Sequence, residues 1–298
     1  MTAVNPSSSP SLVARLIETG AHQKLLAFAS LVLLLIGFSI ASPNFMQTSN
    51  MIAILQATSV NGVLAVAATL VIITGGIDLS VGTLMTFCAV IAGVVLTNLG
   101  MPLPLGVIAA IATGALCGLC SGTFIAKMKI PPFIATLGMM LILKGLSLVI
   151  SGTRPIYFND TPGFDLISRG SLIGDIFPAL PIPNGVLILF LVAGVASYIL
   201  GRTVLGRYTF ALGSNEEAVR LSGVNTDFWK MSVYALAGSI CGIAGILIAS
   251  RLNSAQPALG LGYELEAIAA VVIGGTSLSG GRGTVLGTLI GALIMAVL

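Results

Sequence analysis

The stretch that decides the fold is residues 51–74, which read MIAILQATSVNGVLAVAATLVIIT. It carries no charged side chain, and about 20 predominantly apolar residues are enough for one helix to cross a bilayer. The whole chain has the same character, since 56% of its 298 residues are hydrophobic and 8% are charged, against roughly a quarter charged in soluble domains. We therefore predict an all-α fold, a polytopic transmembrane helical bundle.

Further apolar runs lie on both sides of this stretch. With the quoted one, those of spanning length are Leu25 to Ala41, Met51 to Thr74, Val81 to Leu99, Leu105 to Met128, Pro132 to Ile150, Gly185 to Leu200 and Met231 to Ser250. Two others, Leu265 to Gly275 and Thr284 to Leu298, are short or interrupted. We expect about nine spans here. Because the last run reaches Leu298 without a Lys or Arg anchor, we expect a tenth span in a full-length chain.

Basic residues predict the orientation, because cytoplasmic loops carry an excess of Lys and Arg. With a cytoplasmic N-terminus, nine basic residues fall inside: Arg15, Lys24, Lys127, Lys129, Arg202, Arg207, Arg220, Lys230 and Arg282. Three fall outside: Arg154, Arg169 and Arg251. We therefore expect a multi-pass protein whose N-terminus is cytoplasmic.

The chain divides into a polar start and one membrane domain. Residues 1–24 are polar, and no A-x-A-like site follows the first apolar run, which argues against a cleaved signal peptide. We predict a cytoplasmic segment over 1–24 and a single transmembrane domain over 25–298, with an outside loop at 151–184 and an inside loop at 201–230. The outside loop holds Asp160, Asp165, Asp175 and five prolines. It is either an ordered lid or docking surface, or a plain connector.

Composition excludes several classes of site. The four cysteines, Cys88, Cys117, Cys120 and Cys241, lie inside apolar runs, which is typical of small packing residues and not of a disulfide framework. The single histidine, His22, precedes the first span, so we expect no metal site. The net charge of +3 is too small to indicate a nucleic-acid partner.

Glycines recur at a spacing of four residues in three of the apolar runs. The stripes are Gly114, Gly118 and Gly122, then Gly238 and Gly242, and finally Gly283, Gly287 and Gly291. Lipid offers no hydrophobic drive for helix association, so helices in a membrane approach closely through small residues. The stripes predict a tight bundle and carry no chemistry.

Two segments share the pattern G-G-x-x-L-S-x-G, residues 75–82 (GGIDLSVG) and 274–281 (GGTSLSGG). Each interrupts a hydrophobic segment, and paired interruptions indicate a translocation pathway in transporters. The alternative is an ordinary loop in which Asp78 or Ser80 caps the next helix. The candidate pathway residues in these two echoes are Gly75, Gly76, Asp78, Ser80, Gly274, Gly275 and Ser279.

The second span carries neutral polar side chains close together, among them Gln56, Ser59 and Asn61. Such groups in hydrocarbon need partners, either a neighbouring helix or a hydrated cavity. Neutral hydrogen-bonding groups suit an uncharged polyol, so these three are further candidates for the translocation path. Interhelical hydrogen bonding is the alternative for each of them.

The chain has no means of hydrolysing ATP by the usual route. Residues 278–282, LSGGR, look like the signature of ABC-type ATPases, but no G-x-x-x-x-G-K-[ST] phosphate loop occurs in the sequence. We expect no catalytic residue and no cofactor bound by this chain.

The inside loop contains a capped helix, GSNEEAVRLSGVN at residues 213–225. Ser214 as N-cap with Glu217 three residues later fits a capping box, and Gly223 is placed for the C-terminal end. A short helix of about two turns between two spans favours docking to a cytoplasmic partner. A helix lying on the membrane surface is the alternative.

Several stretches together resemble bacterial monosaccharide ABC importer permeases. They are Gln56 to Asn61, Gly75 to Gly82, Gly206 to Tyr208 with Gly213 to Glu216, Ala255 to Pro257, and Gly262 to Ala270. The resemblance runs from Leu25 to Leu298. It implies a permease subunit, not an enzyme, in a bacterial cell inner membrane, with ribose as the sugar expected first and xylose or galactose as alternatives.

The resemblance also implies partners. The permease would form a homodimer, receive sugar from a periplasmic binding protein, and be driven by a cytoplasmic ATPase that binds ATP and magnesium. The coupling helix that meets this ATPase would consist of Ser214, Asn215, Glu216, Glu217, Ala218, Arg220, Leu221 and Gly223. The rivals are an ion-coupled secondary transporter, which few intramembrane carboxylates disfavour, and a channel-like or scaffold subunit.

Overall fold

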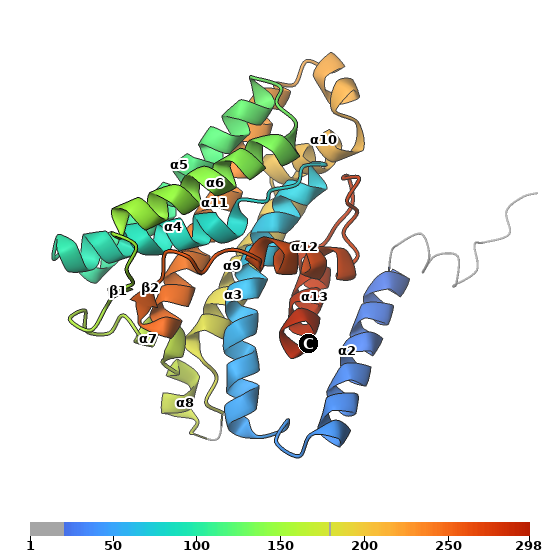
Figure 1. Cartoon of the computed structure of the whole chain (residues 1–298). Coiled ribbons are helices and arrows are strands. Elements are labelled where there is room, and N and C mark those ends of the chain that lie inside the picture. Colours follow the sequence, from blue (N-terminus) through green and yellow to red (C-terminus); the bar gives the residue numbers. More distant parts are fainter. Residues whose placement is uncertain (1–20, 179) are drawn as a thin grey trace, which may run out of the picture.

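The computed structural model describes residues 21–178 and 180–298, and this part of the chain is helical apart from two very short strands (Figure 1). The longer helices are α2 (Ala21–Ala41), α3 (Thr48–Ile73), α4 (Val81–Gly93) continued by the π-helix η1 (Val94–Asn98), α5 (Leu103–Ala126), α6 (Pro132–Ile150), α9 (Asn184–Arg202), α10 (Val204–Leu221), α11 (Thr226–Leu252), α12 (Tyr263–Ile273) and α13 (Val285–Val297). The short elements are β1 (Ile156–Tyr157), α7 (Leu166–Arg169), α8 (Leu172–Ile176) and β2 (Ser254–Ala255).

The prediction of an all-helical polytopic bundle is confirmed. In the described residues, six helical segments are long and apolar enough to cross a membrane: α3, α4 with η1, α5, α6, α9 and α11. Two shorter apolar helices are Leu25–Ala41, within α2, and α13. The remaining expected segment, Leu265 to Gly275, corresponds to α12, whose 11 residues extend about 16 Å at 1.5 Å per residue. That is half of the roughly 30 Å hydrocarbon core, so α12 cannot cross a bilayer alone.

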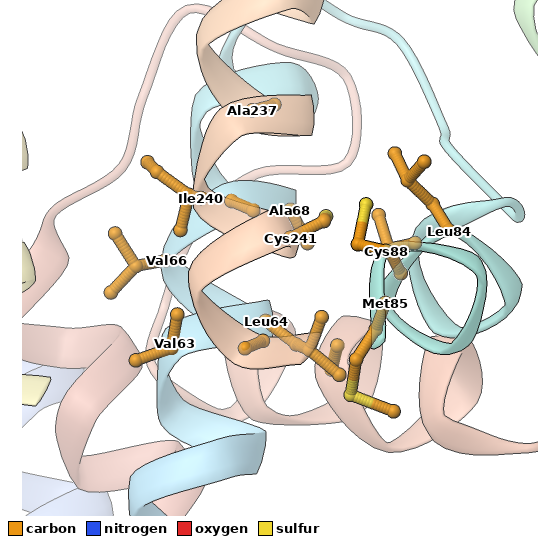
Figure 2. Close-up of a cluster of buried hydrophobic side chains, with 14 of the residues drawn as sticks. Val63, Leu64, Val66, Ala68, Leu84, Met85, Cys88, Ala237, Ile240 and Cys241 are labelled. Carbon is orange, nitrogen blue, oxygen red and sulfur yellow. The ribbon is translucent and has the colours of Figure 1, made fainter. Parts of the chain in front are cut away.

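The core lies where α3, α4 and α11 meet (Figure 2). Helix α3 is buried on all sides from Thr58 to Ile73 except at Asn61, as expected for a helix that is apolar all round. Figure 2 shows buried side chains of α3, α4 and α11 in one cluster, among them Leu64, Cys88 and Cys241. These two cysteines therefore act as small packing residues.

The outer helices turn apolar side chains outward. Leu33 of α2, Val149 of α6 and Leu191 of α9 are each more than two-thirds exposed. In a soluble protein such a surface would cause aggregation, but hydrocarbon tails are as apolar as leucine. The exposed apolar surface fits a protein whose solvent is lipid.

The first two glycine stripes bring α5 and α11 into close contact. A Cβ added at Gly114 of α5 would lie 2.1 Å from the carbonyl oxygen of Gly238 of α11, and one at Gly118 would lie 2.2 Å from that of Tyr234. We call this contact the α5–α11 seam. The third stripe packs on α12, since a Cβ at Gly287 would lie 2.0 Å from the oxygen of Gly274. The predicted tight packing is confirmed.

The connections gather at two ends of the bundle. One end, which we call the α10 end, carries the turn 74–80, the loop 127–131, residues 202–226 and the loop 274–284. Lys129 and Asp227 form an ion pair there at 2.7 Å, and Gly281 N donates to Ile73 O at 2.9 Å.

The opposite end, the β end, carries residues 151–183 and 253–262. Here β1 pairs antiparallel with β2, with Ile156 opposite Ala255. The Oγ of Ser250 donates to Phe164 O at 2.7 Å and accepts from Ser168 N at 2.9 Å. The long loop 151–184 is thus fastened to the end of α11, and its service as a lid or docking surface stays a prediction.

Candidate functional site

The first echo, residues 75–82, joins α3 to α4 by a tight turn that needs both glycines. Gly75 has φ 80°, in the left-handed region, which glycine adopts without strain. A Cβ at Gly76 would lie 2.5 Å from the hydroxyl oxygen of Tyr234 in α11. The turn therefore passes directly against the core helix.

Asp78 holds this turn together from within. Its Oδ1 accepts hydrogen bonds from the backbone N of Ser80 at 2.8 Å and from the Ser80 Oγ at 2.6 Å, which is an Asx turn leading into α4. Burial raises the pKa of the Asp78 carboxyl, and the two hydrogen bonds from Ser80 act in the opposite direction. Asp78 thus forms a local turn just before α4, but neither Asp78 nor Ser80 caps that helix with a side-chain hydrogen bond, and the place of Asp78 in a pathway stays a prediction.

Thr136, at the start of α6, fixes the same turn from outside. Its Oγ1 accepts from Leu79 N at 3.1 Å and lies 3.2 Å from Ile77 O, to which it donates. Sequence reasoning missed this residue, because a single threonine near a helix start gives no signal of a distant partner.

The second echo, residues 274–281, joins α12 to α13. Gly275, Gly280 and Gly281 all have positive φ, between 71° and 86°. The loop closes on itself, since Ser277 N donates to Arg282 O at 3.0 Å, and Ser279 is exposed at its tip. Gly274 is buried against Gly287 of α13. The shared sequence pattern thus produces two glycine turns at one end of the bundle.

The polar residues of α3 do not form one cluster. The Ser59 Oγ is buried, donates to Gln56 O at 2.7 Å, and faces the start of α9, where a Cβ at Gly185 would lie 2.9 Å away. Asn61 faces another way, and its Nδ2 donates to Glu266 Oε2 of α12 at 2.7 Å. Ser59 is therefore packed against α9, and Asn61 makes the interhelical hydrogen bond that was the alternative, while a role for either in a path stays a prediction. A role for Gln56 in a path stays a prediction.

The coupling-helix residues lie in the last part of α10, after a sharp kink. Asn215 has non-helical backbone angles, φ −164° and ψ 94°, and its Oδ1 accepts from Ala218 N at 3.0 Å. Asn215 is therefore the N-cap, and the predicted capping box of Ser214 with Glu217 is wrong. Ser214 stays in the preceding helix and donates to Phe210 O, and Glu217 pairs with Arg220 instead.

The helix after the kink is presented to solvent. Asn215, Glu217, Ala218, Arg220 and Leu221 are exposed. Gly223 has φ 81°, the left-handed conformation that ends helices, so its predicted place is confirmed. The Glu217 carboxylate accepts a hydrogen bond from Arg220 and raises the pKa of its guanidinium.

One ion pair after the kink and one aromatic contact before it fasten α10 to α11. Glu216 accepts from Lys230 Nζ at 2.6 Å, and the rings of Tyr208 and Trp229 are 4.9 Å apart. The exposed helix is therefore held in a defined position on the bundle. In the described residues, no three His, Cys, Asp or Glu side chains gather as a metal site requires.

The sequence of this chain is similar to those of known transport proteins. Residues 50–298 match the family model described as "Branched-chain amino acid transport system / permease component". The ribose import permease protein of Escherichia coli strain K12 is 46% identical over 269 residues, which cover 90% of this chain and 82% of the relative.

Two other relatives carry the names of different sugars. The fructose import permease protein of Rhizobium meliloti is 41% identical, over 90% of this chain and 74% of its own. The xylose transport system permease protein of Escherichia coli strain K12 is 33% identical, over 85% of this chain and 78% of its own. No solved structure matches the chain.

Proposed function

The chain belongs to the ABC-transporter permease family whose model it matches, and on that premise we propose that it carries a monosaccharide, ribose first, across a bacterial inner membrane. Permease components of this kind work with an ATPase and a binding protein. The sugar would be handed over by a periplasmic binding protein, and ATP and magnesium would be bound by the separate ATPase subunit. The permease itself performs no chemistry on the sugar.

The observation that carries the proposal is the exposed, capped helix after Asn215. It is a charged helix at the end of an otherwise apolar bundle, and Lys230 anchors it through Glu216 at 2.6 Å. A loop needs no such helix to connect two spans. An ATPase that closes on ATP needs a firm element to push, and this helix provides one.

Basic residues support a cytoplasmic position for the α10 end. Seven lie there: Lys127, Lys129, Arg202, Arg207, Arg220, Lys230 and Arg282. Three lie at the β end: Arg154, Arg169 and Arg251. Because Lys and Arg are in excess in cytoplasmic loops, we place the α10 end and the N-terminus in the cytoplasm. The β end, with loop 151–184, then faces the periplasmic binding protein.

A second copy of the chain completes the proposed translocation path. Two permeases would rearrange around a central route, with Asn61, Asp78 and the second echo as its candidate wall in each copy. Chemical cross-linking followed by mass measurement in detergent would show a species of twice the mass of one chain. A purely monomeric permease in the assembled complex would contradict this arrangement.

Uptake by the assembled complex tests the function. We expect permease, ATPase and binding protein in proteoliposomes to accumulate labelled ribose only when ATP is supplied on the ATPase side. Uptake that follows a proton or sodium gradient without the ATPase would instead support a secondary transporter.

Replacing Glu216, Glu217 and Arg220 together by alanine should abolish ATPase binding, whereas Lys129→Ala, at an exposed ion pair on the same end, should not. If the triple variant still binds the ATPase and transports, the coupling assignment is wrong.

The choice of sugar is tested separately. The relatives are named for ribose, fructose and xylose, and the permease contributes neutral groups that suit any small polyol. Binding of the partner periplasmic protein to ribose, fructose, xylose and galactose, measured by calorimetry, would rank them. We expect ribose to bind most tightly, and tight binding of a non-sugar would overturn the substrate class.

A further inference from the structure

Three separate segments meet at the α10 end without any side chain between them. A Cβ added at Gly213 of α10 would lie 1.8 Å from Ile73 O and 2.4 Å from Gly281 N, and these two atoms are themselves hydrogen-bonded at 2.9 Å. Ile73 ends α3, and Gly281 ends the second echo. Gly213 therefore sits on a hydrogen bond that ties the end of α3 to the second echo.

The other glycines of this contact are equally confined. A Cβ at Gly280 would lie 2.8 Å from Gly75 N and 2.9 Å from Gly213 O, and one at Gly281 would lie 2.6 Å from the Ser214 Oγ. Real Cβ contacts are not this short. We call Ile73, Gly75, Gly213, Gly280 and Gly281 the glycine junction. In Figure 1 it lies where α10 approaches the end of α3 and the loop between α12 and α13.

The position of the junction in the chain suggests what it connects. Gly213 precedes by two residues the kink at Asn215, where the exposed coupling helix begins. On the other side, α3 enters the core with α4 and α11, and the second echo leads into α13. The junction is therefore where the helix that leads directly into the exposed helix meets both segments proposed to line the path.

Backbone contact makes this connection stiff. Flexible side chains between two elements can change rotamer and absorb a displacement, whereas close-packed groups with no free volume transmit it. Here peptide groups touch peptide groups, and a hydrogen bond fixes their register. A displacement of the coupling helix that carries Gly213 with it must also move α3 and the second echo or break the contact.

We propose that Gly213 and Gly281 are positioning residues for transport, because the glycine junction joins the coupling helix, the end of α3 and the second echo into one rigid body. This inference rests on the proposed function, since it concerns how movement imposed by the ATPase reaches the path. The proposed role differs from close packing alone, which holds the bundle together but does not transmit movement from the coupling helix.

The first test separates coupling from folding. Gly213→Ala places one methyl group on the Ile73–Gly281 hydrogen bond, and Gly201→Ala is the matched control, because Gly201 is also helical, lies at the same end, and has nothing within 4 Å of an added Cβ. Both variants are assembled with ATPase and binding protein in proteoliposomes. We expect Gly213→Ala to keep basal ATP hydrolysis but to lower the sugar transported per ATP by about tenfold, a typical size for coupling between sites.

The outcomes are distinguishable. If Gly201→Ala and Gly213→Ala transport the same amount of sugar per ATP, the junction does not couple and the inference is overturned. If the wild-type complex itself takes up no sugar with ATP, the proposed function fails instead. A loss of ATP hydrolysis and transport in equal proportion by Gly213→Ala would indicate a purely structural role and would also overturn the inference.

A disulfide provides a second test that leaves Gly213 unchanged. The added Cβ at Gly281 lies 2.6 Å from the Ser214 Oγ, the position that a cysteine sulfur would take, and 3.2 Å from the Ser214 Cα, so the two side chains meet closely enough for a disulfide, whose Cβ atoms are roughly 4 Å apart. In a Ser214→Cys, Gly281→Cys variant, oxidation should cross-link the junction, and Ser214→Cys alone controls for the native cysteines.

A rigid body loses nothing when it is cross-linked. We expect the oxidised double variant to transport as well as the same sample treated with reductant. If oxidation stops transport and reductant restores it, the two sides must move apart during the cycle, and the inference is overturned. Failure of the cysteines to cross-link would contradict the contact itself.

Discussion

The α5–α11 seam and the glycine junction are both built from glycines, but the two contacts differ in what they connect. In the seam, two long helices approach so closely that a Cβ at Gly114 would lie 2.1 Å from Gly238 O, and one at Gly238 would lie 2.1 Å from Gly114 O. In the junction, a helix meets two turns, and a hydrogen bond from Gly281 to Ile73 crosses the contact. The seam is a symmetric packing contact inside the bundle, while the junction connects the bundle to its exposed helix.

The comparison between the seam and the junction shows that the spacing of glycines in the sequence does not by itself indicate their structural role. Lipid gives helices no hydrophobic reason to associate, so the seam holds α5 to the core by close van der Waals contact. The junction lies at the end of the bundle, where elements of different kinds meet. We therefore expect substitutions in the seam to lower the stability of the whole bundle, and substitutions near the junction to lower that stability by a smaller amount.

The largest effect should come from filling the seam. Gly238→Leu places a branched side chain against the backbone of Gly114, and overpacking a close-packed interior costs about 1–3 kcal/mol and occasionally more. Because backbone atoms cannot change rotamer, we expect the upper part of that range or outright misfolding. The measurement is the thermal unfolding of the purified permease in detergent, followed by size-exclusion chromatography.

The same substitution elsewhere is the control. Gly194 lies on the exposed face of α9 with nothing within 4 Å of an added Cβ, so Gly194→Leu should leave the unfolding temperature nearly unchanged. Equal unfolding temperatures for the two leucine variants would mean that the seam is not needed for the bundle.

The next largest effect should come from the turn that adjoins the junction. Asp78→Ala removes the acceptor for two hydrogen bonds from Ser80 and leaves a buried backbone N–H without its partner, which costs about 1–3 kcal/mol. Asp78→Asn keeps an acceptor oxygen and should lose clearly less. Chemical unfolding of both variants measures the difference. If the two variants are equally stable, packing and not hydrogen bonding holds the turn.

The spans could be predicted from sequence because they depend on composition alone. A run without charge such as residues 51–74 is long enough for a membrane helix wherever its neighbours lie. The glycine stripes could likewise be recognised as close contacts. Their partners could not, because a spacing of four residues says that one face of a helix is approached closely but not by which helix.

The sequence pattern predicted the wrong N-cap because two neighbouring residues can both cap a helix. Ser214 with Glu217 matches a capping box, yet Asn215 caps the helix. Serine and asparagine are nearly equal as N-caps, so the choice falls to the surroundings, and Gly213 and Ser214 are held in the preceding helix against the junction. The junction itself joins residues far apart in the chain, and no local pattern predicts such a contact.

A smaller effect is expected at the hydrogen bond between Asn61 and Glu266, which joins α3 to α12 away from both glycine contacts. Asn61→Ala should cost about 1 kcal/mol, since the bond is partly exposed and one hydrogen bond contributes about that much net. A double-mutant cycle with Glu266→Ala isolates the pair. Additive losses from the two single variants would show that the side chains do not interact in solution.

The smallest effects should come from the two ion pairs beside the coupling helix, and their ranking sharpens the comparison. The Lys230 side chain is 16% exposed in its pair with Glu216, whereas that of Lys129 is 59% exposed in its pair with Asp227. Exposed pairs contribute about 0–1 kcal/mol because water and salt screen them. Lys230→Met should therefore lower stability by about 0.5 kcal/mol and Lys129→Met by less. Unfolding at low and high salt measures both, and the loss from Lys230→Met should persist better at high salt. If the two losses are equal and vanish together in salt, the coupling helix is held by the glycine junction and the Asn215 kink, and its ion pair contributes nothing of its own.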